Sequence, residues 1–125
     1  MEPIFNDSLF QGNIGIIHVN NILEFHLVIP DNLQQQKLGT IIFKRSIAQF
    51  NPSIVKGNWK TSDVYSGGES INLTIFKQKL SEGFTPQAAA FETPTGKILK
   101  ENGFGGTPTI IIDTSDEVII HFNPN

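Results

Sequence analysis

Residues 70–104 constrain the fold of this chain most, because they carry three helix starts in close succession. Ser70 is a capping residue in front of an apolar segment, and threonine–proline pairs stand at 85–86 and 93–94. Threonine at the cap with proline in the first helical turn is typical of a helix start. A glycine such as Gly83 is typical of a helix end. The pattern predicts three short helices, over residues 71–82, from Pro86 through Phe91, and over residues 94–101.

Two apolar segments near the N-terminus predict a β-hairpin. Residues 14–19 and 22–29 are strand-like, and they are joined by Asn20-Asn21, a pair that tolerates positive φ in a two-residue turn. This turn places Val19 opposite Ile22 and fixes which side chains share a face. The face predicted to be buried carries Ile14, Ile16, His18, Leu23, Phe25 and Leu27, whereas the other carries Ile17, Val19, Glu24 and His26.

The remaining segments complete an α+β pattern. A helix is predicted over residues 37–50 from apolar residues at three- and four-residue intervals, and a third strand over 53–60, with Gly57 marking a bulge. Residues 109–113 and 118–122 predict a second hairpin. Both of its strands are apolar on two faces, so we expect them inside the sheet. The order is β-β-α-β-α-α-α-β-β, with the helices packed on an antiparallel or mixed sheet.

Composition narrows the class of protein. A chain of 125 residues predicts one domain, and the absence of cysteine excludes disulfides, thiolate metal sites and a cysteine nucleophile. No apolar run approaches the roughly 20 residues that span a bilayer, so we expect no membrane partner. The segment Met1–Asp7 lacks the apolar core of a signal peptide. We therefore expect the cytoplasm as the location, or delivery into the cytoplasm of a target cell.

Charge is unevenly distributed along the chain. Residues 1–31 carry a net charge of −4, residues 32–62 carry +5, and residues 63–125 carry −4. A basic middle in an acidic chain can indicate an anionic partner, although an ordinary solvated helix face and strand edge is the more common explanation. Both interpretations stay open at this point.

Glu24 and His26 form the first candidate site. Two residues apart on one strand, they share a face at a spacing of roughly 7 Å. Histidine suits proton transfer near neutral pH, and a carboxylate can orient it. With Lys44 or Arg45 nearby, the set would resemble a metal-independent nuclease site with a base, an orienting group and a phosphate clamp. The alternative is an exposed strand face with incidental charges.

The other histidines are expected to be structural. His18 falls on the predicted core face and His121 on an apolar strand, so both are expected to be partly buried and hydrogen-bonded. No two histidines stand at the short spacings of a zinc site, so we expect no metal and no cofactor.

Two further groups are candidates for nucleic-acid binding. Trp59, between Asn58 and Lys60, is a candidate platform for stacking a base, although such an aromatic is more often a core residue. The segment Thr93-Pro94-Thr95-Gly96-Lys97 is a candidate anion site at a helix start. Helix capping explains its threonine and proline but not the glycine, which costs stability in a first turn.

Several motifs in the second half of the chain together resemble the C-terminal domains of bacterial polymorphic toxins of the Rhs and filamentous-haemagglutinin types. The similarity covers about residues 38–122. Its motifs are Gly57-Asn58-Trp59, residues 67–73 with Phe76, Ala89–Lys97 and Asn102-Gly103-Phe104. The resemblance implies an effector that acts on nucleic acid, often RNA, and an immunity protein as partner. It also implies pocket roles for Trp59, Ser70, Asn72, Thr93, Thr95 and Lys97. No histidine falls inside the matched motifs.

We therefore expect a toxin-like domain, most simply a metal-independent ribonuclease that acts in bacterial competition. His26 would be the acid/base and Glu24 its orienting group. Phosphate and base contacts would come from Lys44, Arg45, Trp59, Asn72, Thr93, Thr95 and Lys97. The alternatives are a non-catalytic protein-binding module, immunity-like or an adaptor, that uses the basic segment against an acidic partner, and an ordinary α+β domain.

Overall fold

The computed structural model describes residues 13–28, 38–62 and 68–125. Within these ranges the chain forms one five-stranded mixed sheet and four helices, which confirms the predicted α+β class. The strands are β1 Asn13–Val19, β2 Ile22–Val28, β3 Ile54–Lys60, β4 Thr109–Asp113 and β5 Glu117–Phe122. The helices are α2 Leu38–Phe50, α3 Ile71–Ser81, α4 Pro86–Glu92 and α5 Pro94–Glu101. Position 37, where the first helix was predicted to begin, position 29 and the segment Met1–Asp7 lie outside the described residues.

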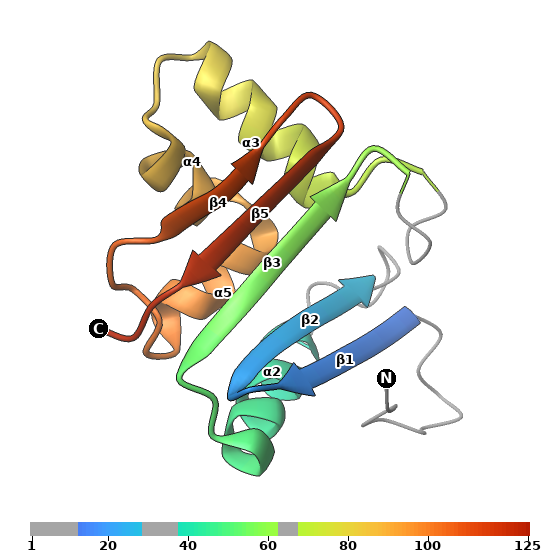
Figure 1. Ribbon diagram of the computed structural model, residues 1–125, viewed down its shortest axis with the longest axis vertical. Helices are drawn as coiled ribbons and strands as arrows, with labels where there is room; N and C mark the ends of the chain where they lie inside the picture. Colours follow the sequence, from blue (N-terminus) through green and yellow to red (C-terminus); the bar gives the residue numbers. More distant parts are fainter. Residues whose placement is uncertain (1–12, 29–37, 63–67) are drawn as a thin grey trace.

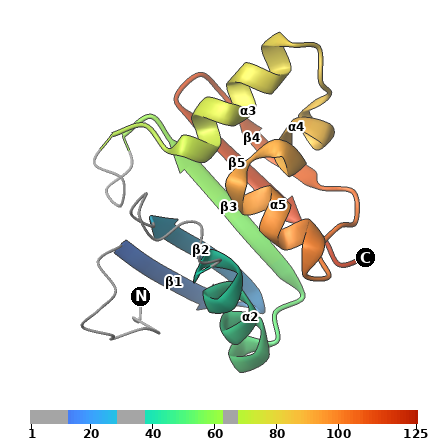
Figure 2. The same cartoon turned by 180° about the vertical axis from the view of Figure 1, so that it is seen from behind.

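The sheet has the strand order β1-β2-β3-β5-β4, and the helices lie along one side of it (Figures 1 and 2). We call the side that the helices cover the inner face and the opposite side the outer face. β2 and β3 are parallel, because α2 carries the chain back between them, and the other neighbouring strands are antiparallel. No helix in the described ranges is both long and apolar enough to cross a membrane.

The N-terminal hairpin is as predicted. Asn20 and Asn21 have φ angles of 52° and 65°, which is the backbone that a two-residue hairpin turn of this kind requires. Val19 pairs with Ile22, and His18 pairs with Leu23. Short-range turn chemistry therefore determines the register of β1 and β2, and with it the face on which each side chain lies.

A single core fills the space between the inner face and the helices. Burial alternates along β3 and β5, so that Trp59, Val118 and Phe122 are buried while their sequence neighbours lie on the outer face. From the helical layer, α3 contributes Phe76 and α2 contributes Phe43. The sheet therefore has an apolar inner face and an outer face that carries the alternate, more polar side chains.

The prediction that both C-terminal strands lie inside the sheet is right for β5 and wrong for β4, which is an edge strand. Ile110 pairs with Ile120 and Ile112 pairs with Ile119, so the residue between them, Ile111, is an extra one, and it is 48% exposed. Such a bulge reverses the alternation of side chains. The isoleucines of β4 therefore point to both faces of the sheet, but they are not buried on both.

The bulge predicted at Gly57 is also wrong, because β3 and β5 pair in unbroken register past it. The glycine has a packing role instead. A Cβ at this position would lie 3.1 Å from ring atoms of Trp59. The absence of a side chain lets the indole fold back over the inner face of its own strand.

Candidate functional site

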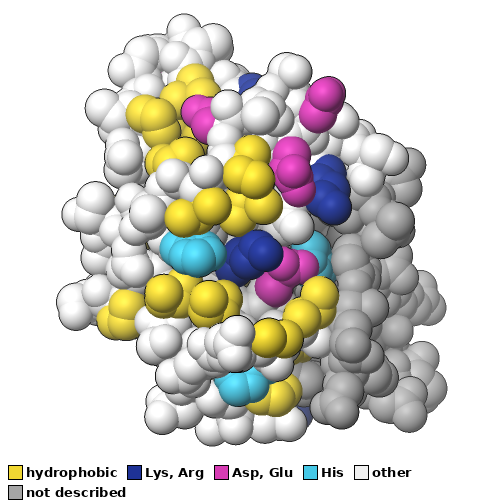
Figure 3. Space-filling view, viewed as in Figure 1, with side chains coloured by type: hydrophobic (Ala, Val, Ile, Leu, Met, Phe, Trp, Pro, Cys, Tyr) yellow, Lys and Arg dark blue, Asp and Glu magenta, His cyan; other side chains and the backbone are white. Residues whose placement is uncertain are grey.

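A row of charged and titratable side chains crosses the outer face. Glu24 on β2 pairs with Lys56 on β3, and Lys56 pairs with His121 on β5. His26 lies two residues beyond Glu24 on the same face of β2. Figure 3 shows this row, in which a lysine and an acidic side chain lie between two histidines with apolar side chains above and below.

The carboxylate of Glu24 joins two partners in this row. Its Oε2 lies 2.6 Å from Nε2 of His26, and its Oε1 lies 3.2 Å from Nζ of Lys56. The side chains of His26 and Glu24 are only 12% and 13% exposed, whereas that of Lys56 is 30% exposed. Glu24 and His26 are thus in direct contact, as predicted, and Lys56 is the cation beside the Glu24 carboxylate.

The same contacts set the ionisation of Glu24. The hydrogen bond from His26 lowers the pKa of the carboxyl below its ordinary value, with burial opposing and the charges of His26 and Lys56 adding to the effect. Glu24 is therefore a carboxylate at neutral pH. An ionised, nearly buried carboxylate holds the imidazole in a fixed orientation.

His121 lies on the outer face, and it is partly buried, as predicted. It stands directly across from Lys56. Burial, and then the positive charge of Lys56, lower the pKa of His121. Its imidazole is consequently neutral at neutral pH.

For His18, the prediction of partial burial is wrong. Its side chain is exposed, and its ring contacts that of Phe50 at the end of α2, with 4.9 Å between the centroids. The residue lies beyond the buried part of the inner face, at the turn end of β1.

Lys44 and Arg45 do not complete the site. Both are exposed residues of α2, which lies on the inner side of the sheet (Figure 2), whereas Glu24 and His26 lie on the outer face. The basic segment is therefore split, with these two residues on one side and Lys56 and Lys60 on the other. The described lysines and arginine of this segment therefore do not form one continuous face. An acidic group stands beside each of the two lysines on the outer face, Glu24 at 3.2 Å from Lys56 and Glu117 at 3.9 Å from Lys60.

Trp59 is not available as a stacking platform. It is 3% exposed, and its ring packs against those of Phe76 and Phe122 with centroid distances of 5.9 and 6.3 Å. Its polar neighbours Asn58 and Lys60 point to the opposite face because side chains alternate along a strand. The indole is a core residue.

The polar residues at the α4–α5 junction satisfy one another. The hydroxyl of Thr93, which is fully buried, accepts a hydrogen bond from the N–H of Gly96 at 3.0 Å and donates one to the carbonyl of Ala90 at 2.7 Å. The side-chain oxygen of Asn72 accepts from the N–H of Thr95 at 3.0 Å. The N–H groups that were expected to hold an anion therefore already have partners.

Gly96, which capping does not explain, has a steric reason. A Cβ on this residue would lie 1.9 Å from the carbonyl oxygen of Ala90. Lys97 is exposed on the same helix. The whole junction belongs to the helical layer, so the sheet separates it from Glu24 and His26, and the two candidate groups do not form one site.

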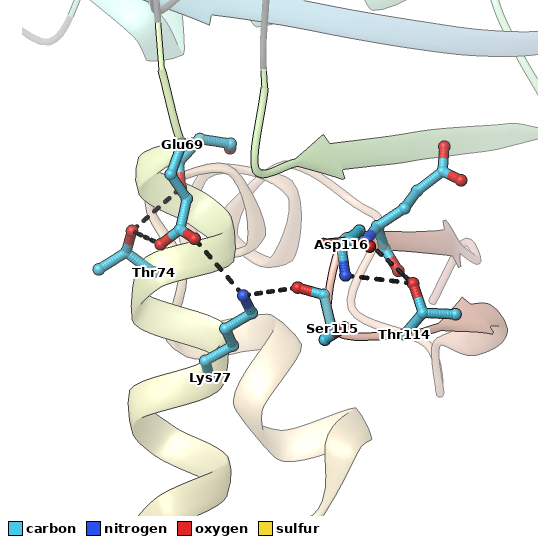
Figure 4. A network of polar contacts seen from close by, with 8 residues as sticks. Glu69, Thr74, Lys77, Thr114, Ser115 and Asp116 are labelled. Carbon is cyan, nitrogen blue, oxygen red and sulfur yellow. Dashed lines mark hydrogen bonds and ion pairs between the residues drawn. The ribbon is translucent and has the colours of Figure 1, made fainter.

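Ser70 and its neighbours tie α3 to the sheet. Ser70 is buried, its N–H donates to the carbonyl of Lys60 at 2.9 Å, and its side chain makes no cap hydrogen bond. Figure 4 shows the adjacent network, in which the carboxylate of Glu69 lies between Thr74 and Lys77. Lys77 also donates to the carbonyl of Ser115, in the turn between β4 and β5, at 2.8 Å.

This network is structural. The hydrogen bond from Thr74, ahead of the charge of Lys77, lowers the pKa of Glu69. Its hydrogen bonds join Glu69, Thr74 and Lys77 at the start of α3 to the β4–β5 turn.

Asn58 is the exception to the pairing of polar groups. Its Oδ1 is the one buried side-chain oxygen or nitrogen without a hydrogen-bond partner in the described part of the chain. The residue lies on β3 between Lys56 and Lys60, opposite Ile119. A buried, unpaired acceptor lowers the stability of the folded protein, and this one lies next to the charged row.

No three His, Asp or Glu side chains of the described ranges are placed to hold one metal ion. In comparisons with known proteins, the chain matches no family model, no curated protein and no solved structure.

Gly96→Ala is expected to destabilise the protein by about 2–3 kcal/mol, because the new methyl group overlaps the Ala90 carbonyl and α4 and α5 must separate. Chemical denaturation measures the loss. Gly68→Ala is the matched control, since a Cβ there has no atom within 4 Å, and it should change the free energy of unfolding by less than about 0.5 kcal/mol. Equal effects of the two substitutions would contradict this assignment.

The free energy of unfolding is expected to decrease as the pH is lowered and Glu24 becomes protonated. Because its pKa is lowered in the folded protein, its contribution is fully present above the ordinary value of 4.5 and is lost as pH falls through the folded value. Denaturation at a series of pH values should therefore show a smaller acid loss for Glu24→Gln than for the wild type. Parallel curves for the two proteins would show that the Glu24 contacts contribute nothing.

Asn58→Val is expected to raise the free energy of unfolding by about 1 kcal/mol, because it removes the unpaired oxygen and suits a strand. Asn72→Val is the contrasting control, because it removes the acceptor of the Thr95 N–H and should lower stability. Thermal melts of the two variants provide the measurement. A lower melting temperature for Asn58→Val would mean that the oxygen has a partner in solution.

Proposed function

We propose that this chain is a toxin-like effector domain that cleaves RNA without a metal ion, at the row on the outer face. His26 moves the proton, Glu24 orients His26, and Lys56 binds the phosphate. The single observation that carries the proposal is the carboxylate of Glu24, which contacts His26 at 2.6 Å and Lys56 at 3.2 Å. Base, orienting group and cation are thereby brought to one point.

RNA suits this set because it contains its own nucleophile. Cleavage needs a group that removes the proton of the ribose 2′-hydroxyl, a cation beside the phosphate oxygens, and a proton for the departing 5′-oxygen. The 2′-oxygen then forms a bond to phosphorus as the bond from phosphorus to the 5′-oxygen breaks. The products are a 2′,3′-cyclic phosphate and a 5′-hydroxyl.

The phosphate contacts differ from those expected from the sequence. Lys56 takes the role assigned to Lys44 and Arg45, which lie on the other side of the sheet. Lys60 lies four residues beyond Lys56 along β3 on the outer face, and it is 51% exposed and 3.9 Å from Glu117. It is the natural contact for a neighbouring phosphate, because a loosely held surface ion pair is readily exchanged.

The toxin assignment and the immunity partner rest on the resemblance over residues 38–122. Of its motifs, Trp59, Thr93 and Gly96 have packing and capping roles in the core and the helical layer. The resemblance therefore concerns the fold, and the proposed chemistry rests on the outer face alone.

The test is cleavage of single-stranded RNA by the purified chain in buffer that contains EDTA. His26→Ala should lower the rate about 10²–10⁴-fold, which is the usual contribution of a general acid or base. Lys56→Ala should raise KM more than it lowers kcat, since it removes binding to the phosphate.

Lys97→Ala is the matched control. Because Lys97 lies in the helical layer, this variant should cleave RNA at the wild-type rate. An oligonucleotide with hydrogen in place of the 2′-hydroxyl should resist cleavage. Intact RNA with the wild-type chain, or a normal rate with His26→Ala, would contradict the proposal.

The second candidate is a non-catalytic protein-binding module that uses the outer face in place of the basic segment. The observation that favours it is that acidic groups stand beside both lysines of this face and that Ile54 and Ile119 flank the row half-buried. A charge-balanced, partly apolar sheet face suits a protein partner. A stable complex that survives His26→Ala but is lost with Ile119→Lys would favour this function.

A further inference from the structure

We propose that His121 is a second catalytic residue of the same site, the base that removes the proton of the ribose 2′-hydroxyl, while His26 protonates the departing oxygen. This inference rests on the proposed RNA cleavage and deepens it. Cleavage needs a proton acceptor and a proton donor on opposite sides of the phosphate, so one histidine cannot fill both roles. The second role goes to His121, which lies outside every motif that the sequence analysis identified.

The register of the sheet brings the two histidines to the same lysine. Lys56 has Glu24 as its partner on β2 and His121 as its partner on β5. Directly paired side chains have Cβ atoms roughly 5 Å apart. A phosphate bound by the ammonium group of Lys56 therefore has His121 on one side and the Glu24–His26 pair on the other.

The surroundings of the two imidazoles differ in the way that a divided role requires. His26 is held by a carboxylate at 2.6 Å. His121 faces the ammonium of Lys56 from β3 and the uncharged Thr109 from β4. Burial and Lys56 lower its pKa, so the imidazole is neutral and ready to accept a proton at neutral pH. Two titratable groups in opposite electrostatic surroundings are the usual arrangement of an acid and a base.

The proton balance is complete. The O–H bond of the 2′-hydroxyl breaks and its proton passes to the imidazole of His121, as the 2′-oxygen bonds to phosphorus. The bond from phosphorus to the 5′-oxygen breaks, and that oxygen takes a proton from His26. The Lys56 ammonium stays charged throughout, and the two histidines exchange protonation states through water before the next turnover.

A substrate with an altered leaving group separates the two roles. When sulfur replaces the bridging 5′-oxygen, the departing thiolate is stable without a proton, so the acid is dispensable and the base is not. We expect His26→Ala to be at least about 10²-fold slow on ordinary RNA and close to the wild type on the sulfur substrate. His121→Ala should be slow on both.

His18→Ala is the matched control, since the third histidine lies beside Phe50 and away from the row. His121→Asn keeps a polar side chain of similar reach that accepts no proton at neutral pH, and it should be as slow as His121→Ala. Melting temperatures establish that each variant is folded.

The wild-type pH profile gives a readout that needs no variant. On the sulfur substrate, the rate should rise with pH through a single ionisation below the ordinary histidine value of 6.5 and then level off, because His121 must be deprotonated to act.

The outcomes separate this inference from the function on which it rests. No cleavage by the wild type overturns both. Cleavage with a normal rate in His121→Ala or His121→Asn overturns the role of His121 alone. Rescue of His121→Ala, and not of His26→Ala, by the sulfur substrate overturns the assignment of His121 as the base.

Discussion

Burial of the inner side chains of β3 and β5 against the helices holds this molecule together, and it fixes where every other side chain of those strands must lie. Trp59, Val118 and Phe122 fill the core, so Lys56, Lys60 and His121 have no place except the outer face. Because β2 is added to β3 in register, Glu24 meets Lys56 there. The candidate site is therefore a consequence of core packing, since no loop or cleft is needed to assemble it.

The parts of the fold that depend on local chemistry follow from the sequence. The register of β1 and β2 is set by the two asparagines of the turn, and the helix starts are set by Thr85 and Thr93, whose hydroxyls accept the hydrogen bonds that capping requires. The position of β4 depends on a bulge instead. An extra isoleucine gives the same apolar pattern as a fully buried strand, so alternation alone cannot distinguish an edge strand with a bulge from an inner one.

The candidate site likewise has one part that follows from the local sequence and one part that does not. Glu24 and His26 are two residues apart on one strand, and their pairing can be inferred from that spacing. Lys56 and His121 are brought to them only by the strand order, which joins segments more than 30 residues apart and which no local pattern specifies. Of the two interpretations of Trp59, the core residue is the right one. Its polar neighbours in the strand lie on the opposite face, so an aromatic between two polar residues is the buried one.

Glu24 has two effects on this site that oppose each other. Its charge orients His26, and it also neutralises Lys56, the cation that would hold the phosphate in the proposed reaction. A phosphate must therefore share the ammonium with the carboxylate, and repulsion between the two anions weakens ground-state binding. In the proposed cleavage, His26 lies on the Glu24 side of Lys56 and donates the proton, and the acceptor role is left to His121, which lies on the far side of Lys56.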